Sequence, residues 1–267
     1  GFYQNVKDVY FFEALKAGAT LHAPCVNQSE YLTTVYDKAI YVGMVHIQGL
    51  QSKLAEQIVK NRQEKGPFLS LENFVRRISI VATQLEILIQ IDAFRFTGMN
   101  KYELMWEKNR VFNPKDQHRI QPALFDDPAE KVSLPKLTPI KYDQAFAERE
   151  QLGFFLKNPF DLLPSPERFY DCITASQLPD SIGKMVRMVG YFICTKHTLT
   201  RQKETMYFGC WLDSELQFFD TVHFPISLQK YRFRGRGLYL IRGVVDSDFG
   251  FASVTVVEMV LLSMVNS

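Results

Sequence analysis

The chain changes character at the run MVRMVGYFIC, Met185–Cys194. Val, Ile, Tyr and Phe are frequent in it, which is typical of a β-strand. Four similar runs follow, and the segment between the third and the fourth can form a short helix. Five strands with a helix in that place are the layout of an OB-fold barrel, which we expect over residues 183–267. The later runs are Thr205–Leu212, Gln217–His223, Leu238–Val245 and Ala252–Leu262, and the helical segment is Pro225–Tyr231.

Alternation along the second run predicts which of its side chains fill the barrel. Successive residues of a strand point to opposite faces, so one set faces inward and the other outward. The outward set includes Tyr207 and Trp211, whose rings could stack on bases. The inward set is Met206, Phe208, Cys210 and Leu212.

A basic loop is expected beside these outward rings, between the first and second strands. OB-folds bind single-stranded nucleic acid with a combination of stacking platform and basic loop. A solvated loop, with aromatics covered by a neighbouring domain, explains the same residues without a ligand. The candidate single-strand site consists of Lys196, Arg201, Lys203, Tyr207 and Trp211, with His197 in the same loop.

The segment Lys230–Arg236 places four cations at alternate positions, with Tyr231 and Phe233 between them. In an extended chain the cations project to one side and the aromatics to the other. That arrangement suits phosphate contacts with apolar anchoring, and a solvated turn is equally compatible with the charges.

The first half of the chain shows helical periodicity instead. Leu50, Leu54 and Ile58 share one face directly after the tight segment Ile47–Leu50. A glycine turn between two helices can direct backbone N–H groups at a phosphate, as in a helix-hairpin-helix. An ordinary helical turn with a solvated basic helix is the alternative. The candidate DNA-binding residues are Gly49, Leu50, Gln51, Lys53 and Arg62.

A second hairpin could follow at Asp92-Ala93-Phe94. The preceding helix is expected to start at a capping box, Thr83-Gln84-Leu85-Glu86. Asp92 brings negative charge to the place where a phosphate would approach, so we expect this hairpin to be structural.

Between the two halves lies a proline-rich linker, residues 111–142. It holds the peptide Gln121-Pro122-Ala123-Leu124-Phe125, an amide and two large apolar side chains in a segment unsuited to helix or strand. Such a peptide is suited to dock into a groove on a partner. The candidate docking residues are Gln121, Ala123, Leu124 and Phe125.

Composition excludes several functional classes. The net charge is +2 and the pI about 8.3, so nucleic-acid binding must depend on local patches. The four cysteines form no C-x-x-C pair, which predicts neither a zinc site nor a disulfide framework and favours the cytoplasm. No catalytic constellation, metal site, cofactor motif or membrane span is recognisable.

Taken in order, these pieces resemble the C-terminal part of the bacterial DNA polymerase III alpha subunit, a C-family replicative polymerase. The likeness spans nearly the whole chain, through motifs that are short but collinear. Gln51 and Asp92 depart from it, because they stand where the family's hairpins have glycines. The matching stretches are Gly1–Tyr3, Pro24–Ser29, Ile47–Leu50, Ile58–Arg62, Gly66–Leu71, Leu88–Phe94 and Glu150–Leu156.

The resemblance implies a domain layout and a function. Residues 1–39 would end the polymerase fingers, 40–110 form tandem helix-hairpin-helix units, 143–182 a helix and connector, and 183–267 the OB-fold. The family's catalytic aspartates lie in an upstream palm domain, so this chain would not polymerise DNA alone, although its parent resembles a DNA-directed DNA polymerase.

The implied partners are a sliding clamp, taken up by Gln121–Phe125, and double-stranded DNA. The OB-fold would add single-stranded DNA or other replisome subunits. The alternative is a replisome scaffold whose OB-fold does not bind DNA.

Overall fold

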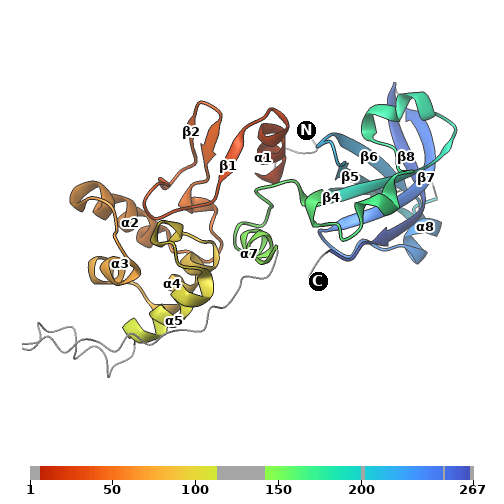
Figure 1. Cartoon of the computed structure of the whole chain (residues 1–267). Helices are drawn as coiled ribbons and strands as arrows, with labels where there is room; N and C mark the ends of the chain where they lie inside the picture. The colour runs from red at the N-terminus through yellow and green to blue at the C-terminus, as the bar shows by residue number, and fades with distance from the viewer. Residues whose placement is uncertain (1–6, 113–141, 200–201, 249, 265–267) are drawn as a thin grey trace, which may run out of the picture. The chain divides into compact units, whose positions relative to one another are not determined.

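A computed structural model of the chain describes residues 7–112, 142–199, 202–248 and 250–264. These residues form two compact units (Figure 1). A mainly helical unit lies within Ala19–Leu156, and a β-barrel unit combines the first 18 residues with Lys157–Ser267. The helical unit therefore takes in residues on both sides of the boundaries expected at 39 and 142.

The barrel has the topology of an OB-fold, which confirms the predicted fold class. Its five strands close in the order β4-β5-β6-β8-β7, and α8 connects β6 to β7 (Figure 1). All neighbouring strands are antiparallel except β6 and β8, which run parallel. The strands are β4 Met185–Leu199, β5 Thr205–Leu212, β6 Phe218–His223, β7 Leu238–Asp248 and β8 Phe251–Leu261, and α8 is Pro225–Lys230.

Both faces of the barrel wall are buried where β4 and β5 pair. Trp211 and Tyr239 fill the interior, at 0% and 1% exposure. On the outside, Phe12 of α1 (Lys7–Lys16) meets the ring of Tyr191 edge-on at 5.8 Å. A strand buried on both faces carries no clear alternation of polarity. Short 3-10 helices lead into the barrel: η4 Pro159–Leu162, η5 Pro166–Phe169, η6 Ala175–Gln177 and η7 Pro179–Ser181.

The helical unit surrounds a core of aromatic rings. Phe74 meets Phe68 at 4.9 Å and Phe94 at 5.0 Å, and all three rings are buried. A small sheet, in which β3 pairs parallel with β1 and antiparallel with β2, precedes the helices. The elements are β1 Thr20–His22, β2 Thr34–Tyr36, β3 Ala39–Tyr41, η1 Met44–His46, α2 Ser52–Lys65, α3 Leu71–Arg77, α4 Ala82–Gln90, η2 Arg95–Thr97, α5 Lys101–Phe112 and α7 Asp143–Leu152.

Helix starts follow the local sequence only in part. Ser70 caps α3, because its hydroxyl accepts the backbone N–H of Asn73. The capping box expected for α4 is wrong, since that helix begins at Ala82 with Val81 as its uncapped N-cap. The side chain of Gln84, in the first turn of α4, bonds to the backbone of Gly49 and Gln51.

The helices on either side of the proline-rich segment in sequence, α5 and α7, are in contact with each other. The segment follows α5 in sequence, and α7 after it packs against α4 and α5. The Tyr102 hydroxyl of α5 donates to Asp143 at 2.7 Å, and Lys101 forms an ion pair with the same carboxylate at 2.5 Å. Burial alone would raise the pKa of Asp143, but the bonds from Lys101 and Tyr102 outweigh it and lower that pKa. The two helices that flank the proline-rich segment in sequence therefore belong to the same unit.

Candidate nucleic-acid interfaces

The Gly49 turn is fixed from beneath by a side chain of α4. Gln84 donates its amide to the Gly49 carbonyl at 2.7 Å and accepts the Gln51 backbone N–H at 2.8 Å. Gly49 has φ +77°, a left-handed conformation that favours glycine. Gln84 is only 9% exposed, so its two bonds hold the turn in one shape. Sequence reasoning missed this residue, although an amide beside the apolar stripe of Leu85 was a signal.

The surface of this turn is open and mildly positive. Gly49, Gln51 and Lys53 are exposed, and Leu50 is half-buried. The first turn of α2 carries no acidic residue, and Lys53 forms no ion pair with any residue that the structure describes. The N-terminal turn of a helix directs unsatisfied N–H groups outward, which suits a phosphate.

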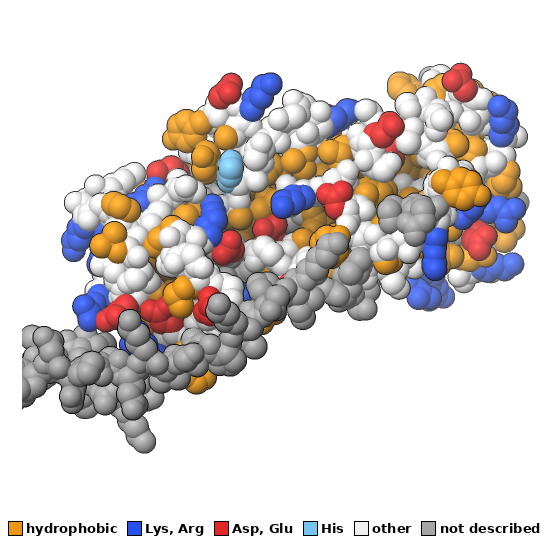
Figure 2. Space-filling view, viewed as in Figure 1, with side chains coloured by type: hydrophobic (Ala, Val, Ile, Leu, Met, Phe, Trp, Pro, Cys, Tyr) orange, Lys and Arg blue, Asp and Glu red, His pale blue; other side chains and the backbone are white. Residues whose placement is uncertain are grey.

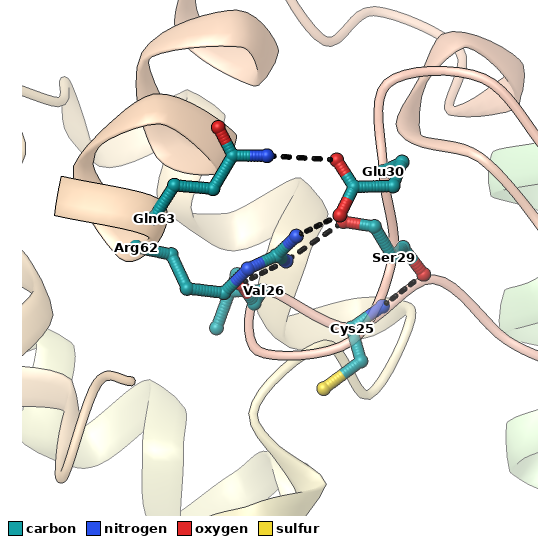
Figure 3. Close-up of polar contacts among 6 residues, drawn as sticks. All are labelled: Cys25, Val26, Ser29, Glu30, Arg62 and Gln63. Atoms are coloured by element: carbon teal, nitrogen blue, oxygen red, sulfur yellow. Dashed lines mark hydrogen bonds and ion pairs between the residues drawn. The ribbon is translucent and has the colours of Figure 1, made fainter. Parts of the chain in front are cut away.

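Arg62 does not belong to that surface, contrary to expectation. Its guanidinium donates to the carbonyls of Val26 at 3.0 Å and Ser29 at 2.8 Å, and pairs with Glu30 at 2.6 Å (Figure 3). Its side chain is 10% exposed. Arg62 therefore fastens the loop before β2 to α2, and cannot reach a phosphate without breaking these contacts.

The residues of the second hairpin turn also make their contacts within the protein. Asp92 adopts φ +60°, the left-handed conformation that a glycine would take most easily. Burial raises the pKa of its carboxyl, and the charge of Arg95 acts in the opposite direction. Arg95 itself donates to the carbonyls of Ala23 at 2.8 Å and Pro24 at 3.1 Å. These contacts support the structural interpretation of this turn.

The predicted orientation of β5 is wrong. Trp211 lies inside the barrel, where its indole N–H donates to the Thr221 hydroxyl at 2.6 Å. Gly209, two residues earlier, faces the same way, since a Cβ there would lie 2.7 Å from that hydroxyl. Phe208 instead faces outward and is 36% exposed. Trp211 therefore cannot stack on a base in the folded barrel.

The remaining described barrel candidates are spread over β4, the turn after it and β5. Lys196 and His197 lie on β4, which extends to Leu199, and not in the expected loop. Lys203 is exposed in the turn after β4. Tyr207 on β5 is half-buried, and its ring lies 5.8 Å from that of His197. Arg201 lies outside the described residues.

Lys230–Arg236 alternates as predicted. Tyr231 and Phe233 pack against the barrel core, while Lys230, Arg232 and Arg234 are exposed. The expected projection of cations and aromatics to opposite sides is confirmed for these five residues.

His223 is buried beneath this segment as a neutral imidazole. Its Nε2 lies 2.8 Å from the Thr221 hydroxyl, and its ring centroid lies 4.6 Å from that of Phe233. Burial lowers the pKa of His223 from 6.5 to about 4. The unfolded chain thus binds a proton more readily than the folded barrel.

Acid should therefore destabilise the barrel through His223. The contribution is complete above pH 6.5 and is lost as pH falls toward 4, by about 3 kcal/mol for this shift. Denaturant titrations at several pH values, followed by Trp211 fluorescence in a Trp106→Phe background, would measure it. His223→Gln should flatten the pH dependence and the exposed His197→Gln should not; equal profiles for the two variants would contradict this assignment.

The candidate docking peptide cannot be placed. Gln121, Ala123, Leu124 and Phe125 lie outside the described residues. Among the described residues there is no group of three or more His, Cys, Asp or Glu that could hold a metal, and none of the described helices is long and apolar enough to span a membrane.

Comparison with known proteins agrees with this architecture. A family model described as "Helix-hairpin-helix motif" matches residues 18–104. The DNA polymerase III alpha subunit of Staphylococcus aureus (strain MRSA252) is 26% identical over 246 residues, 88% of this chain and 22% of that subunit. The error-prone DNA polymerase of Mycobacterium tuberculosis (strain ATCC 25618 / H37Rv) is 31% identical over 96 residues, 35% of this chain and 9% of that polymerase.

Among solved structures, the N-terminal domain of the PriB protein from Thermoanaerobacter tencongensis covers 30% of this chain and 96% of its own, with 12% identity and a TM-score of 0.27. The sequence match to the alpha subunit and the match to the family model confirm the predicted resemblance to the DNA polymerase III alpha subunit and the helix-hairpin-helix motif. The match to the alpha subunit, which takes in most of this chain, spans about a fifth of that subunit's length.

Proposed function

We propose that this chain is the DNA-engaging, non-catalytic region of a polymerase of the DNA polymerase III alpha type. The Gly49 hairpin would hold duplex DNA, Gln121–Phe125 would tether the protein to a sliding clamp, and the barrel would contact the single-stranded template. The observation that carries the proposal is the Gly49 turn, held rigid by Gln84 and open at the start of α2.

The turn suits sequence-independent recognition of a phosphate backbone. Its donors are the backbone N–H groups of the first turn of α2, so no base edge needs to be read. Because Gln84 fixes the turn before DNA binds, the turn loses little conformational entropy on binding. Lys53 adds one exposed positive charge to the same place.

The electrostatic contribution of the rest of α2 is small. Lys60 pairs with Glu64 at 3.8 Å, and Arg62 is used internally. Few cations are left for phosphates, so affinity for isolated duplex should be modest and its salt dependence shallow. A clamp tether would compensate by raising the effective concentration of the hairpin near DNA.

Lys53→Glu should weaken duplex binding about tenfold and reduce the salt slope by about 0.9, the value for one lost phosphate contact. Glutamate near a helix N-terminus favours the helix, so the fold should be preserved. Fluorescence anisotropy with a labelled duplex at two salt concentrations measures both quantities. Lys65→Glu makes the same charge change at the other end of α2; if it weakens binding equally, the hairpin is not the contact.

A replisome scaffold remains the second candidate, because large apolar side chains are exposed on the barrel. Ile226 of α8 is 77% exposed and Phe251 of β8 is 80% exposed. Exposed apolar side chains of this size can mark a protein contact. If the barrel binds no single-stranded DNA and these residues mediate capture of another replisome subunit, the scaffold is the better account.

A further inference from the structure

The sequence stretch Glu150–Leu156 resembles the polymerase family, and the proposed function leaves it without a role. It lies beyond residues 18–104, which the family model matches. In the structure it spans the end of α7 and the residues after it, and it belongs to the helical unit (Figure 2 shows the surface of the molecule). Three of its residues, Gln151, Gly153 and Phe154, lie against the chain that leads into the Gly49 turn.

The end of α7 binds the backbone of this chain directly. The Gln48 N–H donates to the Gln151 carbonyl at 2.7 Å. The last four carbonyls of a helix have no partner within the helix, so this bond gives one of them a donor. Because Gln48 immediately precedes Gly49, the same bond restrains the turn at its start.

Gly153 allows the two segments to approach closely. It ends α7 with φ +87°, a left-handed conformation that favours glycine. A Cβ at this position would lie 2.6 Å from the side-chain nitrogen of Gln48. The Gln48 side chain therefore lies directly over the backbone of Gly153, in space that any other residue would occupy.

The residues on either side of Gly153 are anchored in the helical unit. Gln151 is only 9% exposed and donates its amide to the side-chain oxygen of Gln90 at 2.7 Å. Phe154 is buried, and its ring meets that of His46 edge-on at 6.4 Å. Gln90 ends the same helix, α4, whose first turn carries Gln84. The turn is thus supported by α4 both directly and by way of α7.

We propose that Gln151, Gly153 and Phe154 are positioning residues of the duplex contact. They hold Gln48, and through it the Gly49 turn, in the shape that presents the N–H groups of α2 to a phosphate. This inference rests on the proposed function of the turn. It extends the duplex-binding element beyond the family model, because residues after the proline-rich segment complete it.

Gly153→Ala should weaken binding of a labelled DNA duplex by the full chain on the order of tenfold. The new methyl group displaces Gln48, so the turn adopts its binding shape for a smaller fraction of the time. The salt slope should stay the same, since no cation is lost. Fluorescence anisotropy at two salt concentrations measures both quantities, and thermal melts show that the variant is folded.

Gly98→Ala is the matched control for this experiment. Gly98 adopts φ +71° and ψ 2°, close to the φ +87° and ψ 2° of Gly153, and a Cβ there would meet nothing within 4 Å. It imposes the same backbone strain in the same unit without displacing a neighbour, so duplex affinity should be unchanged. Equal losses in Gly153→Ala and Gly98→Ala would overturn the proposal.

A double-mutant cycle tests whether the effect passes through Gln48. Gln48→Ala removes the side chain that the new methyl group meets, so Gly153→Ala plus Gln48→Ala should bind within about twofold of Gln48→Ala alone. A loss on the order of tenfold that persists in the Gln48→Ala background would contradict the proposed route.

Hydrogen exchange separates positioning from a general structural role. In Gly153→Ala, the peptide that contains the Gln48 and Gln51 amides should lose protection, and peptides of α3 and α5 should not. Loss of protection throughout the helical unit would mean that Gly153 serves only the fold, which would overturn the proposal.

Gln151→Met is a second variant with no backbone strain. It keeps the length of the side chain and removes the amide that donates to Gln90, so duplex affinity should fall several-fold. Gln144→Met makes the same change on the same helix, where the amide contacts Glu148 at 3.4 Å, and should leave affinity unchanged. Equal affinities of the two variants would count against Gln151 as a positioning residue.

Failure of this inference is distinguishable from failure of the proposed function. Lys53→Glu reports the duplex contact itself. If Lys53→Glu weakens binding and Gly153→Ala does not, only the positioning role of α7 is rejected. If neither variant changes duplex binding, the proposed function of the Gly49 turn is rejected as well.

Discussion

Trp211→Ala should lower the free energy of unfolding of the barrel by about 3–5 kcal/mol, the range for deleting a buried large aromatic. Trp211 is 0% exposed and lies among the rings of Phe192, Tyr239 and Phe233, at 5.1, 5.3 and 5.9 Å. Alanine would leave a cavity that these rings cannot close, because the strands fix their positions. It would also remove the donor to the buried Thr221 hydroxyl.

Hydrogen exchange read peptide by peptide is the measurement, because it reports each unit separately. Amides of β4–β8 should lose protection in Trp211→Ala, and those of α2–α5 should not change. Trp106→Ala is the matched control, since Trp106 on α5 is 53% exposed and its loss should cost little. Equal effects of the two replacements would mean that Trp211 is not a core residue.

Leu124→Ala plus Phe125→Ala should reduce affinity for the sliding clamp by about 1,000-fold or more. Two large apolar anchors in a peptide contact are typical hot spots, each costing about 2 kcal/mol or more when truncated. Surface plasmon resonance on immobilised clamp from the same organism measures the loss. The peptide lies in a proline-rich segment whose sequence is unsuited to helix or strand, so circular dichroism should be unchanged.

Val132→Ala plus Leu134→Ala is the matched control for the clamp experiment. It removes two apolar side chains from the same segment but leaves the Gln121–Phe125 pattern intact. Clamp affinity should then be unchanged. If the control reduces affinity as much as the Leu124 and Phe125 pair, the contact is a general property of the segment and the specific peptide is rejected.

The strands were the most predictable part of the fold. Each expected run begins within one residue of the observed strand, because runs rich in Val, Ile, Tyr and Phe are bounded by turn residues. The prediction of which β5 side chains face the interior was wrong for a physical reason. Cys210, Trp211 and Leu212 are all at 0% exposure, so both faces are buried and alternation could not say which one faces the interior.

Long-range partners account for the other differences. Arg62 was predicted to contact DNA because its hydrogen-bond acceptors, the carbonyls of Val26 and Ser29, are more than thirty residues away in sequence and no local pattern reveals them. Gln84 was overlooked for the same reason, since it holds a turn 33 to 35 residues earlier. A motif in one sequence shows local geometry well, but it does not show which side chains the tertiary fold has already used.

The position of DNA on the Gly49 turn is the central claim, and photo-crosslinking tests it most directly. Benzoylphenylalanine would be placed at position 51, exposed beside the turn, or at position 65, at the far end of α2 about 20 Å away. The account predicts that position 51 crosslinks to a DNA duplex at low salt and position 65 does not. Crosslinking from position 65 alone, or equally from both, would contradict it.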